Sequence, residues 1–292
     1  MMGTSLKHDV AASKRPYRRG NKAAIVAMAV LGLLLLVATV GPYLVSDPIA
    51  QSLSDRLTPP MWFEGGNAAY PLGTDALGRD LLSRVVHGAR ISLLVATIAL
   101  AASAVVGIMV GLLAGYYRGL GDDIIMRLVD TQLAIPYVLL AMTLVAVLEP
   151  STGSVFVALL LYGWVIFARL VRGEVLSLRE EEFILASRAL GASSPRILLG
   201  HLLPNLVTPI VIIATLELAN LIIIESALGF LGLGIPPPTP TWGRMIAEGT
   251  TLLTTGVWWV SVVPGLAIIV TILSINVLGD WLRDRLDPRT AS

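Results

Sequence analysis

Long uncharged apolar stretches recur along the chain and alternate with shorter polar ones. Residues 23–45, 91–117, 131–148 and 249–279 contain no charged side chain. A helix needs about 20 apolar residues to cross the hydrocarbon core of a bilayer. The pattern therefore predicts membrane-spanning helices at about 23–45, 91–117, 128–148, 154–171, 207–230 and 257–280.

The composition agrees with this pattern. Of the 292 residues, 55% are hydrophobic and 14% are charged, whereas soluble domains carry about 25% charged residues. Segments of about ten residues with alternating hydrophobicity, which would indicate a membrane β-barrel, do not occur in the sequence. The expected fold class is all-α integral membrane with six helices. The chain has no cysteine, which excludes disulfides, thiol catalysis and cysteine-based metal sites.

The basic residues divide unequally between the two sides of the predicted helices. Only Arg56, Arg79, Arg84, Arg90 and Arg244 of the 21 lie on the side away from the chain ends. Cytoplasmic segments carry the excess of Lys and Arg, so we expect both termini inside. The expected organisation is a basic cytoplasmic tail at 1–22, a first helix at 23–45, an external segment at 46–90, a five-helix core at 91–282 and a cytoplasmic tail at 283–292. The longest cytoplasmic loop is then 172–206.

The external segment contains its own helical pattern. Over 77–86 the apolar residues fall on one helical face. This spacing predicts an amphipathic helix, either on the external membrane surface or against a partner subunit.

The cytoplasmic loop carries the signals of two helices joined at a corner. Three glutamates at 180–182 favour a helix start, Gly191 favours a helix end, and Ser194-Pro195 favours a new start. Small residues around the corner would allow another protein to approach closely. From the residues alone, the loop is either an interfacial helix resting on lipid or a knob that fits a soluble partner.

This loop resembles the EAA loop of binding-protein-dependent ABC importer permeases. The central Ala186, Gly191 and Leu203-Pro204 keep the spacing of that motif, whereas Leu185, Ser187 and His201 depart from it. Two further stretches, from Tyr70 to Leu93 and over 225–243, are similar to the dipeptide, oligopeptide and nickel branch. The resemblance covers about 70–282.

The resemblance implies a type I importer, MetI-like transmembrane domain in the bacterial inner membrane that forms a path for di- or oligopeptides. Its implied partners are a second permease in a heterodimer, two cytoplasmic ATP-binding subunits and an external substrate-binding protein. The 180–204 loop would couple to the ATPase through Glu182, Ala186, Ser187, Arg188, Gly191, Ala192 and Arg196. Nickel, glutathione and opines remain alternative substrates. A stand-alone secondary transporter is the second function considered, although no internal repeat is evident.

Two sets of residues inside the predicted helices also attract attention. Glu217, Asn220 and Glu225 lie in the fifth helix, where charged groups are costly and face a cavity or a partner. They either form hydrogen bonds between helices or line the translocation path. We expect the charge of Glu225 to matter more for transport than that of Glu217. Gly107, Gly111 and Gly115 recur every four residues, which predicts a packing seam within the chain or against the second permease.

Catalytic patterns are missing from the sequence. It contains no HExxH, Walker A or GxGxxG motif, so we expect ATP hydrolysis on partner subunits rather than on this chain. No cofactor, metal or nucleic acid is expected to bind.

Overall fold

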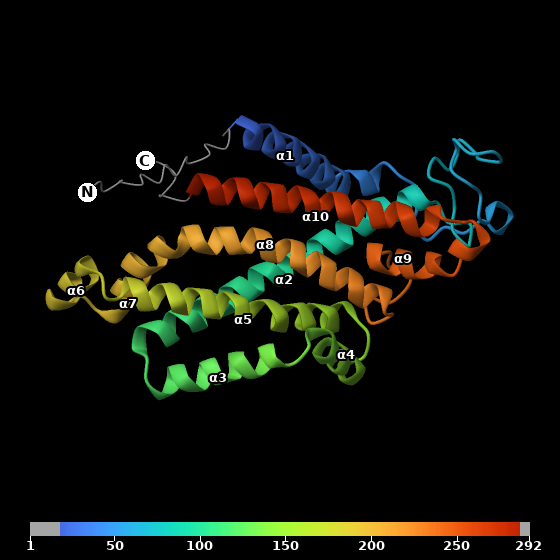
Figure 1. The fold of residues 1–292 in the computed structure, drawn as a ribbon. Helices are drawn as coiled ribbons and strands as arrows, with labels where there is room; N and C mark the ends of the chain where they lie inside the picture. The colour runs from blue at the N-terminus through green and yellow to red at the C-terminus, as the bar shows by residue number, and fades with distance from the viewer. Residues whose placement is uncertain (1–17, 287–292) are drawn as a thin grey trace, which may run out of the picture.

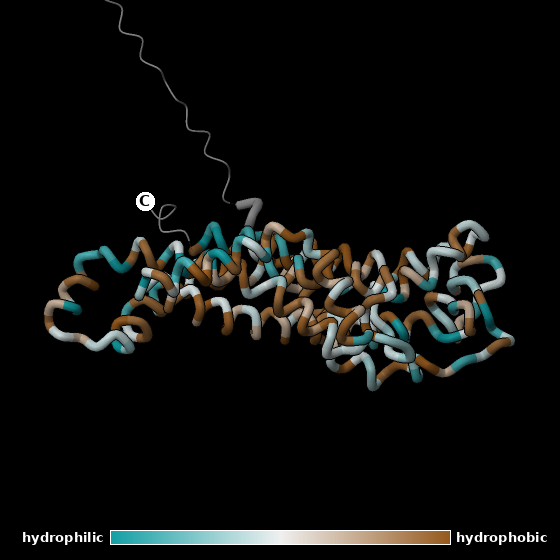
Figure 2. The backbone as a smooth tube through the Cα atoms, turned by 90° about the horizontal axis from the view of Figure 1, so that it is seen from below, coloured by the Kyte–Doolittle hydropathy of each residue, from teal (hydrophilic) through white to brown (hydrophobic). Residues whose placement is uncertain are grey.

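The computed structural model describes residues 18–286. Its regular elements in that range are helical, with no named strand, and residues 44–80 are mostly loop and turns. Figure 1 shows an elongated bundle of long helices. In Figure 2 the hydrophobic segments run through the middle of this bundle, and hydrophilic ones gather toward its two ends. The α-helices are α1 (Arg18–Thr39), α2 (Leu81–Tyr117), α3 (Leu120–Ala134), α4 (Tyr137–Leu148), α5 (Thr152–Leu178), α6 (Glu182–Ala189), α7 (Ser194–Ile197), α8 (Leu203–Phe230), α9 (Trp242–Thr250) and α10 (Trp259–Leu286).

Five helices of the described chain are long and apolar enough to cross a membrane by themselves. They contain α1, α2, α5, α8 and α10, and the segment with α8 begins at α7. The helices α3 and α4 are bent by 95° relative to each other. If this bent pair counts as one broken crossing, the described chain has a sixth span. The all-α membrane fold expected from the sequence is thus confirmed.

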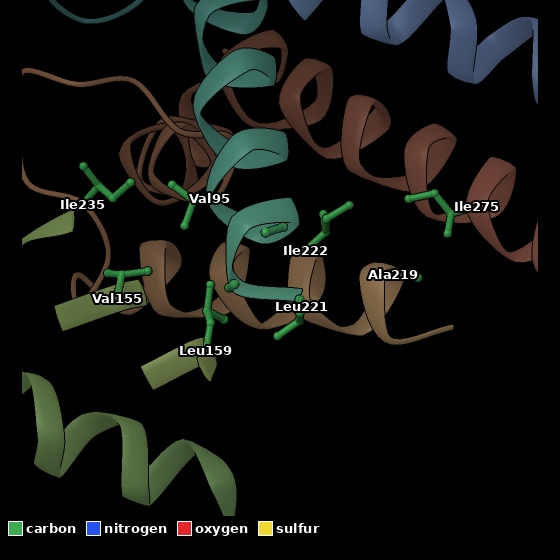
Figure 3. Close-up of a cluster of buried hydrophobic side chains, with 10 residues drawn as sticks. Val95, Val155, Leu159, Ala219, Leu221, Ile222, Ile235 and Ile275 are labelled. Carbon is green, nitrogen blue, oxygen red and sulfur yellow. The ribbon is translucent and has the colours of Figure 1, made fainter. Parts of the chain in front are cut away.

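The core lies where four of the long helices meet. Figure 3 shows Val95 from α2, Leu159 from α5, Ile222 from α8 and Ile275 from α10, which belong to one cluster of buried side chains. Many large apolar side chains on the outside of the helices stay exposed, such as Leu33 on α1. Lipid or other membrane helices would cover these outer faces, because an apolar surface this large is unfavourable in water.

The prediction of one continuous third helix at 128–148 was wrong. The helix stops at Ala134, and Ile135 is extended with φ −86° and ψ 126° before Pro136 starts the next turn. The ring of a proline disfavours helical geometry at the residue before it, which accounts for the break. The uncharged stretch hid this break, because both halves are equally apolar.

The amphipathic helix predicted at 77–86 begins only at Leu81 and is the start of α2, so its placement on the membrane surface was wrong. Residues from Leu81 onward form the first turns of α2, and Leu81 is fully buried. The side chain of Asp80 accepts hydrogen bonds from the amides of Leu82 and Ser83, which fixes the start of the helix. These residues therefore pack inside the protein instead of lying on the membrane surface.

The loop that contains the predicted corner is shorter than the predicted 172–206. α5 continues to Leu178 instead of ending at 171, and helical structure resumes at Ser194. Similarly, α1 begins at Arg18 and α10 reaches Leu286, so parts of both predicted tails are helical. The remaining tail residues, 1–17 and 287–292, lie outside the described range.

Candidate functional site

The predicted helix–corner–helix element is present and projects from one end of the bundle (Figure 1). Its first helix, α6, has eight residues, with Glu182 in the first turn and Arg188 in the last. Both charges complement the helix dipole. Ile184 is the buried residue of α6, and it joins a cluster with Ile197, Leu202 and Leu206. This apolar contact anchors a short helix that would be marginal by itself.

Gly191 forms the corner through a defined C-terminal motif. Its φ is +82°, a conformation that glycine adopts without a steric penalty. The Gly191 amide donates to the Arg188 carbonyl, and the Ala192 amide donates to the Ser187 carbonyl, both at 3.0 Å. These two bonds are those of a Schellman motif. An added Cβ at Gly191 would meet no atom within 4 Å, so its requirement for glycine comes from the backbone angle and not from crowding.

Side chains hold the corner against the end of α2. The Arg188 guanidinium lies 5.4 Å from the centre of the Tyr116 ring, within the range of a cation–π contact. Arg179 donates to the backbone carbonyl of Tyr116 at 2.8 Å. Within the loop, the Ser187 hydroxyl lies 3.3 Å from Nε2 of His201. The corner is therefore tied to α2 and to the start of the next helix.

The outward face of this element is apolar and includes small side chains. Phe183 and Leu185 are nearly half exposed, and Leu190 is 89% exposed. Ala186 and Ala189 lie between them and are also exposed. Among the predicted contact residues, Glu182, Ala186, Arg188, Gly191 and Arg196 are exposed, while Ser187 and Ala192 are half-buried. We call this surface the knob, and it consists of Phe183, Leu185, Ala186, Ala189 and Leu190.

A turn of π-helix joins the corner to α8. Leu198–Leu202 forms this turn, in which the Leu203 amide donates to the Leu198 carbonyl. Pro204 lacks an amide proton and its ring crowds the carbonyl four residues earlier, which accounts for the wider turn. The Asn205 side chain donates to the His201 carbonyl at 2.7 Å. The element thus continues directly into a membrane helix, so movement of the knob can reach α8.

The three glycines of α2 lie against α5. A Cβ at Gly107 would come within 2.5 Å of the Trp164 carbonyl, and one at Gly111 within 2.6 Å of the Ala168 carbonyl. At Gly115 it would meet Val175 at 2.9 Å. The two helices therefore approach each other more closely than any side chain would allow. This contact is within the chain.

The intramembrane carboxylates are buried on α8. Asn220 donates to Glu217 at 3.2 Å, so these two residues lie together. Glu225 is two turns away, 0% exposed, and has the Ser226 hydroxyl at 3.5 Å. Within the described part of the chain, one oxygen of each carboxylate has no hydrogen-bond partner and neither pairs with a basic side chain. Among the described residues, the hydrogen bond of Glu225 thus comes from its neighbour on the same helix.

A network of charged residues at the opposite end of the bundle was not predicted from the sequence. Arg84, which is 1% exposed, pairs with Asp75 and lies 2.8 Å from Glu248 of α9. Arg79 bridges the same two carboxylates at 2.6 and 3.0 Å, and Arg244 contacts Glu248 at 3.0 Å. The network joins the stretch from Tyr70 to Leu93 to α9, which begins at the end of the stretch over 225–243. The Asp80 helix cap was the available signal that Arg84 belongs to a packed helix.

This network lowers the pKa of the Glu248 carboxyl. Burial alone would raise the pKa of its carboxyl, but the nearby guanidiniums of Arg84 and Arg79 outweigh that effect and hold the pKa below its ordinary value. The carboxylate is therefore charged at neutral pH, as the pairing requires.

Comparisons with known proteins place the chain in a family. Residues 107–292 match the family described as binding-protein-dependent transport system inner membrane component. Residues 19–60 match the N-terminal TM domain of oligopeptide transport permease C.

Two relatives match over most of their length. The chain is 42% identical over 270 residues to a di/tripeptide transport system permease protein DppC of Pseudomonas aeruginosa, covering 92% of this chain and 89% of the relative. It is also 42% identical over 277 residues to the dipeptide transport system permease protein DppC of Escherichia coli, covering 94% and 91%. A component of such a system works in a membrane-embedded complex with other transport components. This multi-pass membrane protein belongs to the family of binding-protein-dependent transport system inner membrane components.

Proposed function

We propose that this chain is a membrane-spanning permease subunit of an ATP-driven importer of di- or oligopeptides. The observation that carries the proposal is the knob, an exposed apolar surface on a rigid corner that continues into α8. A peptide substrate is supported by the similarity to permeases that are named for dipeptide transport. That similarity favours peptides over nickel, glutathione and opines, and favours an importer subunit over a stand-alone transporter. The chain is not itself an enzyme, since ATP hydrolysis belongs to partner subunits.

The knob is proposed to seat in a groove of a cytoplasmic ATP-binding subunit. Its alanines allow close approach, and its three larger side chains supply apolar area to bury. The loop over 180–204 would then pass the closure of two ATP-binding subunits to the membrane helices. A second permease would complete the path as a heterodimer, and an external binding protein would deliver the peptide.

The proposed orientation places the knob and both termini in the cytoplasm. The start of α1 and the end of α10 lie toward the same end of the molecule as α6 and α7 (Figure 1), and Trp281 donates to Asn21 at 3.1 Å. Because the chain has no cysteine, single cysteines can report the orientation. Ser193→Cys should react with an impermeant reagent only from the cytoplasm, and Asn67→Cys only from outside. Reaction of both from one side would overturn this orientation.

Co-purification tests the proposed assembly. A tagged chain should bring down an ATP-binding subunit and a second permease from mild detergent. Leu190→Glu should lose the ATP-binding subunit and keep the second permease, because a charge would be buried in the apolar contact. Leu253→Glu, at the opposite end of the molecule, is the matched control and should keep both. A tagged chain that purifies alone would count against the importer and in favour of a stand-alone transporter.

A further inference from the structure

Two opposite charges meet on an exposed face within the membrane-spanning helices. Arg169 of α5 forms an ion pair with Asp130 of α3, and their side chains are 55% and 63% exposed. Arg169 lies nine residues before the end of α5, and Asp130 lies ten residues after the start of α3. At 1.5 Å per residue both are about 14–15 Å from those helix ends. Both helices belong to candidate membrane spans, and the pair lies well inside them instead of at their ends.

The pair is not the clamp that holds α3 against α5. That clamp lies nearer the helix ends, where Arg172 donates two hydrogen bonds to Asp122 at 2.5 and 2.8 Å. Asp122 is buried, as expected for a residue that joins two helices. An exposed ion pair contributes at most about 1 kcal/mol to stability. Charges facing lipid at this depth are rare and costly, so the face with Arg169 and Asp130 borders water or protein.

The break between α3 and α4 supports the same conclusion independently. Ile135 and Pro136 are exposed, and their backbone is not helical. Irregular backbone at membrane depth is tolerated only where protein covers it or where it lines a water-filled cavity. A pocket of about 230 Å³ lies at this break and is lined in part by the polar side chains of Gln132, Tyr137 and Tyr162.

The pocket and the ion pair are close along the helices. Val165 lines the pocket and precedes Arg169 by one turn of α5, while Gln132 follows Asp130 closely in α3. Figure 1 shows α3 alongside α5, with α4 turned away at the end of α3. The pocket at the break and the charged pair are therefore about one helical turn apart along α5.

We propose that Asp130 and Arg169 form a subsite on the translocation path for the charged ends of a short zwitterionic peptide. This inference rests on the proposed function. The carboxylate of Asp130 would accept from the peptide ammonium, and the Arg169 guanidinium would donate to the peptide carboxylate, to which its planar fork is suited. The ends of an extended dipeptide are about 7 Å apart. Both side chains are exposed, so the pair can separate to take up a peptide of this length.

Accessibility gives a test that does not depend on transport. Ala134 is exposed and lies one turn from Asp130 on α3. In the assembled complex, Ala134→Cys should react with a charged methanethiosulfonate reagent, and a saturating dipeptide should slow the reaction. Leu33→Cys on the apolar outer face of α1 should not react. An unreactive Ala134→Cys in the assembled complex would overturn the proposal that a water-lined path passes here.

Charge removal tests the recognition itself. The double variant Asp130→Asn/Arg169→Gln should assemble with normal yield, and the assembled complex should keep its ATPase activity. Dipeptide uptake should fall at least about tenfold, as expected for lost charge-assisted hydrogen bonds. Asp122→Asn is the matched control for a helix clamp and should lower the yield of the complex. Parental uptake by the double variant, or a loss of yield like that of the control, would overturn the subsite. A parental complex that takes up no peptide would instead contradict the proposed function.

Discussion

The guanidinium of Arg84 lies 2.8 Å from the carboxylate of Glu248 and joins the start of α2 to α9. Arg84 also pairs with the buried Asp75, so one side chain connects α2 to the loop just before it and to the distant α9. Nearby, the Trp259 indole donates to the Thr74 carbonyl at 3.0 Å, and the Trp242 indole donates to that of Val85 at 3.0 Å. The end of the bundle opposite the knob is therefore held by long-range polar contacts.

Replacing Glu248 by Gln should destabilise this end of the protein. The change leaves three guanidiniums with Asp75 as the remaining carboxylate of the network. Because Glu248 is 28% exposed, we expect the free energy of unfolding to fall by about 1–3 kcal/mol, which is less than the 3–5 kcal/mol typical when a fully buried pair is broken. Thermal unfolding of the purified complex would measure this loss of stability. Glu64→Gln, on the exposed loop before α2, should leave the unfolding temperature unchanged.

The same carboxylate should make stability depend on pH in the acid range. Its pKa in the folded protein lies below its ordinary value, so the folded state binds fewer protons than the unfolded state near that value. Its contribution is full above about pH 4.3, the ordinary pKa of a glutamate. It is lost as the pH falls through the lower folded-state pKa. The difference in unfolding temperature between the parent and Glu248→Gln should shrink over this range, and a constant difference would contradict the argument.

Substituting Gly191 tests the corner below the knob. A side chain at φ +82° costs about 1–2 kcal/mol, which lowers the population of the corner about 5–30-fold. We expect Gly191→Val to reduce the number of peptides transported per ATP hydrolysed, or to prevent assembly. Gly191→Asn should retain most of the coupling, because asparagine tolerates positive φ. Normal transport and ATPase rates in Gly191→Val would show that this corner does not couple the two.

Glu225 should tolerate the loss of its charge. Since no basic side chain of the described residues pairs with it, Glu225→Gln should keep uptake within about twofold, a change below about 0.5 kcal/mol. Glu225→Leu should lower the yield of the complex, because the nearby Ser226 hydroxyl would lose its partner in an apolar setting. Strongly reduced uptake by a well-assembled Glu225→Gln would restore the interpretation that its charge shapes the path.

Local signals made the loop predictable. Gly191 and Pro195 act through the backbone of their own turns, and the four-residue spacing of Gly111 with its neighbours indicates close packing wherever the partner helix lies. The break at Pro136 had a local signal as well, but the uncharged stretch around it predicted a continuous helix.

Features that depend on distant partners could not be read from spacing. Arg84 appeared to be a surface residue, because Glu248 lies in a different segment of the chain. Arg169 appeared to lie at the very end of its helix, which was predicted to stop at residue 171 where charged residues become frequent. The Arg172–Asp122 clamp allows α5 to continue past that point, which places Arg169 inside the span.

ATP-dependent peptide uptake into proteoliposomes tests the central claim most directly. The vesicles would contain this chain with its second permease and ATP-binding subunits, and the binding protein would be added on the opposite side. A labelled dipeptide should accumulate only when ATP is present on the side of the knob, and uptake should fail when Leu190→Glu replaces the parental chain. Peptide uptake driven by an ion gradient without ATP, or ATP-driven uptake that excludes every di- and oligopeptide, would contradict the account.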